Sequence, residues 1–91
     1  AAREAEPAEV SESELLERAM SAWRAGEVDA AAGWLERHRR AFPAPAYAAE
    51  AEALHTLVRC ARNADPAAGA RFLRAHPRHP FGALVRSACA P

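Results

Sequence analysis

Residues 11–43 read SESELLERAMSAWRAGEVDAAAGWLERHRRAFP, and this stretch predicts two helices joined by a short turn. Ser11 is suited to be an N-cap, and Glu14 stands three residues later, where a capping box places its acid. Apolar side chains then recur at helical spacing up to Gly26, and glycine accepts the left-handed conformation that follows a helix end. The first helix is therefore expected over about 12–25.

The second half of the stretch predicts a helix that returns alongside the first. Val28, Ala31 and Leu35 are spaced three and four residues apart, which places them on one helix face. Basic residues gather near the end of this segment, where they suit the negative end of the helix dipole. Phe42-Pro43 ends the helix, because proline cannot continue it.

Three further helices are predicted beyond this unit. Pro45 is placed to be the first residue of a third helix. Asp65 is suited to be the N-cap of a fourth helix, and Pro80 opens a fifth. The expected ranges are about 46–62 for the third helix and about 66–75 for the fourth, with a flexible lead-in over residues 1–10 and one helical domain over residues 11–91.

The apolar fraction of 51% consists mostly of alanine, with 26 Ala against 18 larger apolar side chains. Alanine is the best helix former and is depleted in strands. This composition excludes a β-sandwich and predicts an all-α fold of about five short antiparallel helices.

The net charge is zero, because 12 Arg balance 12 acidic residues. Nucleic-acid binders usually carry a basic excess, so no nucleic-acid partner is expected. Residues 1–36 sum to −6 and residues 37–91 to +6, so the two halves are expected either to pack against each other within one chain or to associate head to tail between chains. No apolar run approaches the length of a membrane span, so no membrane insertion is expected in this segment, which is interpreted as a soluble piece of a longer protein.

The spacing of two prolines indicates a repeat. Phe42-Pro43 and His76-Pro77 each close a predicted helix, and the two prolines are 34 residues apart. This is the period of the tetratricopeptide repeat (TPR), a helix pair whose units stack into a solenoid. The chain resembles that family through Gly26, Val28, Ala31, Leu35 and Pro43, and in the second unit through Ala53 and Pro77. The resemblance implies two TPR-like helix pairs plus a C-terminal half-unit helix, an α-solenoid fragment. In such a solenoid, small side chains are expected where the helices approach closely, at Ala19, Ala22, Ala31, Ala53 and Ala70.

Three longer motifs are similar to the helical-repeat tails of envelope proteins from GC-rich bacteria. They lie in residues 35–43 (Leu-x-x-His … Phe-Pro), 72–80 (Phe-Leu-x-x-His-Pro-x-x-Pro) and 85–89 (Val-Arg-x-x-Cys). Such tails resemble the repeat domain of the outer-membrane β-barrel assembly lipoprotein and also occur on membrane-bound partners of sigma factors. Where these tails have Ser before the last proline of the second motif, this chain has His79, which weakens the expected N-cap of the fifth helix.

The resemblance implies a protein–protein interaction module located in the periplasm or cell envelope and tethered through a segment outside this chain. A cytoplasmic location is the alternative. In the family the first helix of each unit lines the concave face, which would bind a protein or peptide partner or a second copy of the chain. Carried over by spacing, the face would comprise Ser13, Leu16, Met20, Trp23 and Arg24 from the first unit and Tyr47, Glu50, Leu54, Leu57 and Val58 from the second. Because the chain has only 18 large apolar residues, many of these side chains are expected to lie in the core instead.

Cys60 and Cys89 are the only two cysteines, each near the end of a predicted helix. In an oxidising compartment two cysteines favour a disulfide. Closing a loop of about thirty residues would stabilise the fold by roughly 3–4 kcal/mol. The alternatives are two buried thiols that pack as small apolar residues, or a redox switch.

His76 and His79 have a spacing that could serve a metal, but two prolines constrain the segment and no third ligand lies nearby in sequence. We therefore interpret these histidines as polar residues at helix ends and expect neither metal nor cofactor. A redox- or metal-responsive sensor that uses Cys60, Cys89 and these two histidines is the alternative function. A structural spacer in a larger assembly is a further alternative.

The sequence contains no catalytic pattern, so an enzyme is not expected. It has no Ser/His/Asp elbow, and its four scattered glycines form no phosphate loop. Glu50 and Glu52 fall on different helix faces and cannot act as a paired acid and base. The cluster of Arg37, Arg39 and Arg40 has two interpretations. It binds a phosphate group or an acidic partner, or it is a solvated helix end whose positive charge complements the helix dipole.

Overall fold

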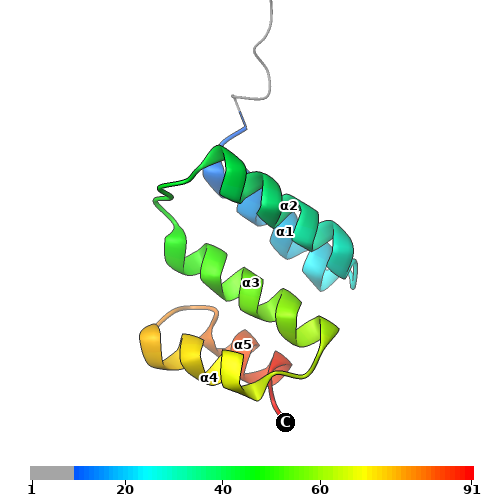
Figure 1. Ribbon diagram of the computed structural model, residues 1–91, viewed down its shortest axis with the longest axis vertical. Helices are drawn as coiled ribbons and strands as arrows, with labels where there is room; N and C mark the ends of the chain where they lie inside the picture. Colours follow the sequence, from blue (N-terminus) through cyan, green and yellow to red (C-terminus); the bar gives the residue numbers. More distant parts are fainter. Residues whose placement is uncertain (1–9) are drawn as a thin grey trace, which may run out of the picture.

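The computed structural model describes residues 10–91, which form five α-helices (Figure 1). The expectation of an all-α fold is confirmed, with no strand among the described residues. Except for Val10, the lead-in expected over residues 1–10 lies outside that part of the chain. None of the described helices is long and apolar enough to span a bilayer. The helices are α1 (Glu12–Arg24), α2 (Val28–Ala41), α3 (Ala48–Arg62), α4 (Pro66–Ala75) and α5 (Gly82–Ala88).

Local signals at the helix ends act largely as expected. The hydroxyl of Ser11 accepts the backbone N–H of Glu14 at 3.1 Å and caps α1. Gly26 has φ +80°, the left-handed conformation expected after α1. Asp65 caps α4 in the same way as Ser11 caps α1. The carboxylate of Glu14, expected to bond back to the cap, accepts instead from Arg18 at 2.7 Å.

The third helix begins later than predicted. Its first residue is Ala48 and its N-cap is Tyr47, so the placement of Pro45 at the first helical position is wrong. The reason is a contact from α1: the carboxylate of Glu12 accepts the backbone N–H groups of Ala46 and Tyr47, each at 3.0 Å. These groups are bound to another helix, which holds the chain in a turn before α3 starts.

The fifth helix also begins later, at Gly82 rather than beside Pro80. The residue that breaks the serine pattern takes over the capping role. The ring Nδ1 of His79 accepts the backbone N–H of Phe81 at 3.0 Å, and the carbonyl of His79 accepts the N–H of Gly82 at 2.9 Å. The imidazole of His79 therefore accepts a backbone hydrogen bond just before α5, where the pattern has a serine hydroxyl.

The helices stack in order along the molecule. α1 and α2 lie side by side, α3 packs against both, and α4 and α5 pack against the other side of α3 (Figure 1). Every helix contributes at least one large side chain to the core. The largest fully buried side chains are Leu15, Leu35, Leu54, Leu57, Phe72 and Val85.

Alanines fill several of the close approaches between helices. Ala70 is exposed, so its predicted place in such a contact is wrong. On α4 the adjacent Ala68 and Gly69 are buried instead, because α4 turns Gly69 toward Cys89 and Val85 of the α5 segment. The four alanines that are buried as predicted are Ala19, Ala22, Ala31 and Ala53.

A matched pair of glycine substitutions tests this close approach. A β-carbon on Gly69 would lie 2.6 Å from the Cβ of Cys89, so Gly69→Ala is expected to destabilise the fold by about 1–3 kcal/mol. A β-carbon on Gly33 in α2 meets nothing within 4 Å, so Gly33→Ala is expected to stabilise it by about 0.5–1 kcal/mol. Urea denaturation of both variants measures the two shifts. Equal shifts of the same sign would contradict the packing described at Gly69.

Candidate functional site

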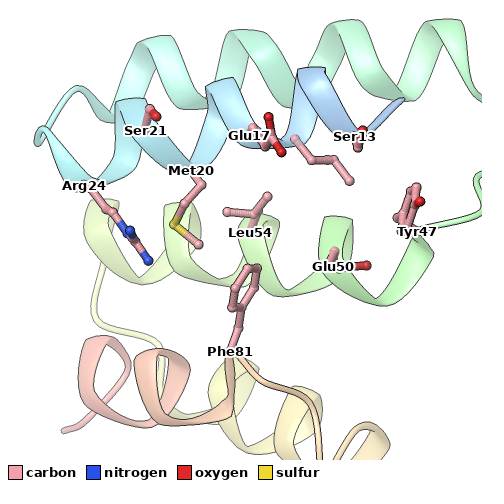
Figure 2. A pocket seen from close by; sticks show the side chains of 10 residues that line it. Ser13, Glu17, Met20, Ser21, Arg24, Tyr47, Glu50, Leu54 and Phe81 are labelled. Atoms are coloured by element: carbon pink, nitrogen blue, oxygen red, sulfur yellow. The ribbon is translucent and has the colours of Figure 1, made fainter. Parts of the chain in front are cut away.

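A hollow of about 560 Å³ lies between α1 and α3 (Figure 2). We call it the α1–α3 groove. Met20 and Leu54 point toward one another across it, and Phe81 approaches from the segment before α5. The lining residues are Ser13, Leu16, Glu17, Met20, Ser21, Arg24, Tyr47, Glu50, Leu54 and Phe81.

Helical spacing explains how two helices build this lining. On α1 the residues at 13, 16, 17, 20, 21 and 24 recur every three or four positions and so share one face. On α3 the residues at 47, 50 and 54 do the same. Leu16 and Leu54 are buried at its base, whereas Tyr47 is 45% exposed at one end. The result is an apolar floor with a polar rim.

The structure brings together most of the residues predicted for a concave face. Trp23, Leu57 and Val58 are the exceptions and do not line the groove. Trp23 is half-buried against the core, and Leu57 and Val58 are buried within it. Helix α3 is the central layer, and α4 and α5 pack against it, so its later turns belong to the core. The residues brought together are Ser13, Leu16, Met20, Arg24, Tyr47, Glu50 and Leu54.

Three lining residues were missed from the sequence. Glu17 and Ser21 lie four and eight positions after Ser13, so the α1 periodicity could have identified them. Phe81 could not be found in this way, because it comes from the connection before α5 and reaches the groove only through the packing of α5 on α3.

The charges around the groove are separated along its length. Glu17 and Glu50 lie in the half nearer Tyr47, and Arg24 lies at the opposite end (Figure 2). Within residues 10–91, some acids and arginines form ion pairs, such as Glu14 with Arg18 and Asp29 with Arg62. Glu17, Glu50 and Arg24 form no ion pair with any described residue, as is also true of several charged residues elsewhere on the surface. The three differ from those residues by lining the groove.

A buried polar contact sets how α1 and α3 meet at the Tyr47 end of the groove. The carboxylate of Glu12 lies 2.9 Å from Nε2 of His38 at the end of α2, and both side chains are buried. The same carboxylate accepts the N–H groups of Ala46 and Tyr47. Burial raises the pKa of Glu12, but the hydrogen bonds from His38 and from these two N–H groups outweigh burial and hold the pKa below its ordinary value.

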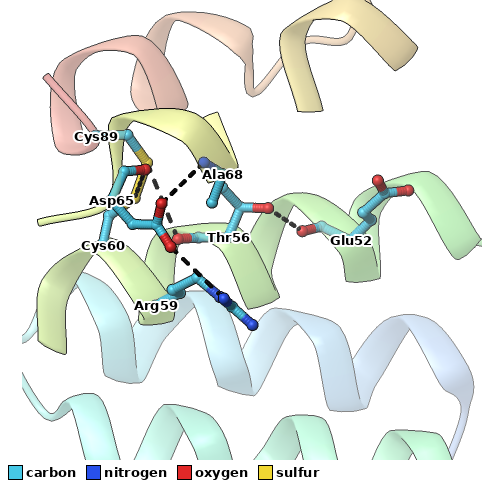
Figure 3. The surroundings of a disulfide bond; sticks show 7 residues. All are labelled: Glu52, Thr56, Arg59, Cys60, Asp65, Ala68 and Cys89. Carbon is cyan, nitrogen blue, oxygen red and sulfur yellow. Dashed lines mark hydrogen bonds and ion pairs between the residues drawn. A yellow bond between two sulfur atoms is a disulfide. The ribbon is translucent and has the colours of Figure 1, made fainter. Parts of the chain in front are cut away.

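Cys60 and Cys89 form a disulfide that ties the end of α5 to the end of α3 (Figure 3). Their Cα atoms are 5.2 Å apart, and both residues are buried. Asp65 lies beside the bridge, where its carboxylate caps α4 through the N–H of Ala68 and lies 3.5 Å from the guanidinium of Arg59. The disulfide thus fixes the short helix α5, whose N-cap residue Phe81 lines the groove.

His76 and His79 contact other residues of the protein. Nε2 of His76 lies 2.9 Å from Glu52, and the rings of His76 and His79 both pack near Phe72. Among the described residues, no three side chains of the ligand types gather as a metal site. These contacts match our interpretation of His76 and His79 as polar residues at helix ends.

The arginine cluster at the end of α2 contacts its own helix. Arg39 and Arg40 pair with Glu36, and Arg37 lies 5.1 Å from the ring centre of Trp34. Arg18 of α1 lies at the same distance from that ring. Cations at the end of α2 also suit its dipole. These contacts favour the interpretation of a solvated helix end over that of a binding site for phosphate or an acidic partner.

The TPR resemblance was compared with the structure and with known proteins. The TPR resemblance depends on the 34-residue proline spacing and on turn residues such as Gly26. It remains a prediction, since an ordered stack of helices is common to many all-α proteins. The chain matches no protein-family model, no curated protein and no solved structure.

Proposed function

We propose that this chain is a protein–protein interaction module, a TPR-like scaffold that binds a peptide segment of a partner in the α1–α3 groove. The observation that carries the proposal is the groove itself, a hollow of about 560 Å³ with an apolar floor and with charged side chains at its rim. Concave sites of this size that combine apolar and polar side chains are typical binding sites. Tyr47 is 45% exposed at its edge, and aromatic side chains are frequent anchors in interfaces.

The proposed location is outside the cytoplasm, in the periplasm or cell envelope of a bacterium. The Cys60–Cys89 disulfide supports this, because disulfides persist in oxidising compartments and are rare where thiol reductants are abundant. Thiol titration under denaturing conditions, on protein purified from the native host without reductant, tests the proposal. No free thiol is expected, and two free thiols would contradict it.

Selection from a displayed library of random twelve-residue peptides tests the groove. Peptides with apolar anchors are expected to be enriched on the oxidised protein. Met20→Ala is expected to weaken the selected peptides about 5- to 30-fold, because it removes an apolar contact from the groove. Leu84→Ala is the matched control, since Leu84 is also a half-buried apolar residue but lies outside the lining.

Two results of this selection would contradict the proposal. One is a lack of enriched peptides, as expected for a structural spacer. The other is equal weakening by Met20→Ala and Leu84→Ala when circular dichroism shows that both variants remain folded, which would place the peptide outside the groove.

A further inference from the structure

The acidic and basic residues on the rim of the α1–α3 groove lie in different parts of it. Glu17 from α1 and Glu50 from α3 face the half nearer Tyr47, and Arg24 stands at the other end (Figure 2). The apolar floor between them is formed by Met20 and Leu54, with Phe81 opposite. A ligand that fills the groove therefore meets negative charge at one end, apolar surface in the middle and positive charge at the other end.

We propose that the groove selects a peptide segment whose apolar anchor lies between one basic and one acidic side chain. This inference rests on the proposed function and names the chemistry of the partner. The basic side chain lies near Glu17 and Glu50, and the acidic side chain lies near Arg24. A segment with two like charges places one of them against a rim charge of the same sign, which disfavours that partner.

The dimensions of α1 give the spacing of these two side chains. Glu17 and Arg24 are seven residues apart, which is about 10 Å along a helix. An extended peptide advances about 3.3 Å per residue, so its two charged residues are expected about three positions apart. The apolar anchor then lies at one of the two positions between them.

Four capped eight-residue peptides test the charge arrangement. All share one apolar core of Leu and Phe, and their flanking positions carry Arg and Glu, two Arg, two Glu, or two Gln. Fluorescence polarisation at low ionic strength measures their affinities for the oxidised chain. The peptide with one Arg and one Glu is expected to bind about three- to tenfold more tightly than each of the other three. Added salt is expected to reduce this difference.

Charge reversals on the protein identify the contacts. Arg24→Glu is expected to change the preference to the doubly basic peptide, and Glu17→Arg combined with Glu50→Arg is expected to change it to the doubly acidic peptide. Arg86→Glu is the matched control, because Arg86 is exposed and lies outside the groove. That control is expected to keep the preference of the natural protein.

The outcomes separate the two levels of the proposal. Equal binding of all four peptides, with loss of binding in Met20→Ala, overturns the charge inference and leaves the groove as the binding site. No binding of any peptide, the neutral one included, overturns the proposed function for this class of ligand. The same change of preference in Arg86→Glu and Arg24→Glu also overturns the charge inference, because net charge rather than position would then decide it.

Discussion

Breaking the Cys60–Cys89 disulfide is expected to lower the free energy of unfolding by roughly 3–4 kcal/mol. The bond links residues 29 positions apart, and closing a loop of that length restricts the unfolded chain by about this amount. For a chain of this size the whole free energy of unfolding is on the order of 5–10 kcal/mol. Loss of the bond therefore removes a large share of the stability.

The effect is expected to be strongest at the C-terminal end. Helix α5 has only seven residues, and Val85 is its only large side chain that is fully buried, so the helix has little stability of its own. Urea denaturation with and without reductant, followed by circular dichroism, measures the loss. Addition of reductant to the Cys60→Ala/Cys89→Ala variant should change nothing. Identical midpoints for the oxidised and reduced natural protein would show that the bond does not stabilise the fold.

Glu12→Ala is expected to lower the free energy of unfolding by about 3 kcal/mol. The substitution leaves buried His38 without its carboxylate and leaves the N–H groups of Ala46 and Tyr47 without their acceptor. Glu14→Ala is the matched control. Glu14 lies on the same helix but forms an exposed pair with Arg18, so less than about 0.5 kcal/mol is expected there.

The pH dependence of stability tests whether the ionised carboxylate of Glu12 is the group that stabilises the fold. The pKa of Glu12 is lower in the fold than in the unfolded chain, so its contribution is complete above the ordinary pKa of 4.5 and is lost as the pH falls through the lowered value. The difference in stability between the natural protein and Glu12→Ala should therefore shrink below about pH 4.5. A difference that stays constant down to pH 3 would mean that the ionised carboxylate is not what stabilises the contact.

Residues that act on their near neighbours were predictable from the sequence. Ser11 and Asp65 cap helices through N–H groups three residues away, and Gly26 adopts the conformation that its own lack of a side chain allows. The groove faces of α1 and α3 were predictable for a related reason. Helical periodicity and the family resemblance together indicated Met20, Arg24 and the other side chains that the structure brings together.

Residues whose role depends on distant partners were not predictable. Glu12 carries no local signal that sets it apart from the other acids of the first helical turn, because its partners lie 26 to 35 residues away. Gly69 gave no local signal, because its small size matters only where α4 meets Cys89. His79 looked like the loss of a capping hydroxyl, yet its ring nitrogen accepts the N–H that the hydroxyl would have taken.

Mapping of backbone amide chemical shifts tests most directly whether the α1–α3 groove is the binding site. The capped peptide with one Arg and one Glu is titrated into the isotope-labelled, oxidised protein. The largest shifts are expected along the lining face of α1, at the start of α3 and at Phe81, with little change in α4 around Arg71, which lines no part of the groove. Shifts concentrated in α4, or no shifts at a saturating peptide concentration, would contradict the account.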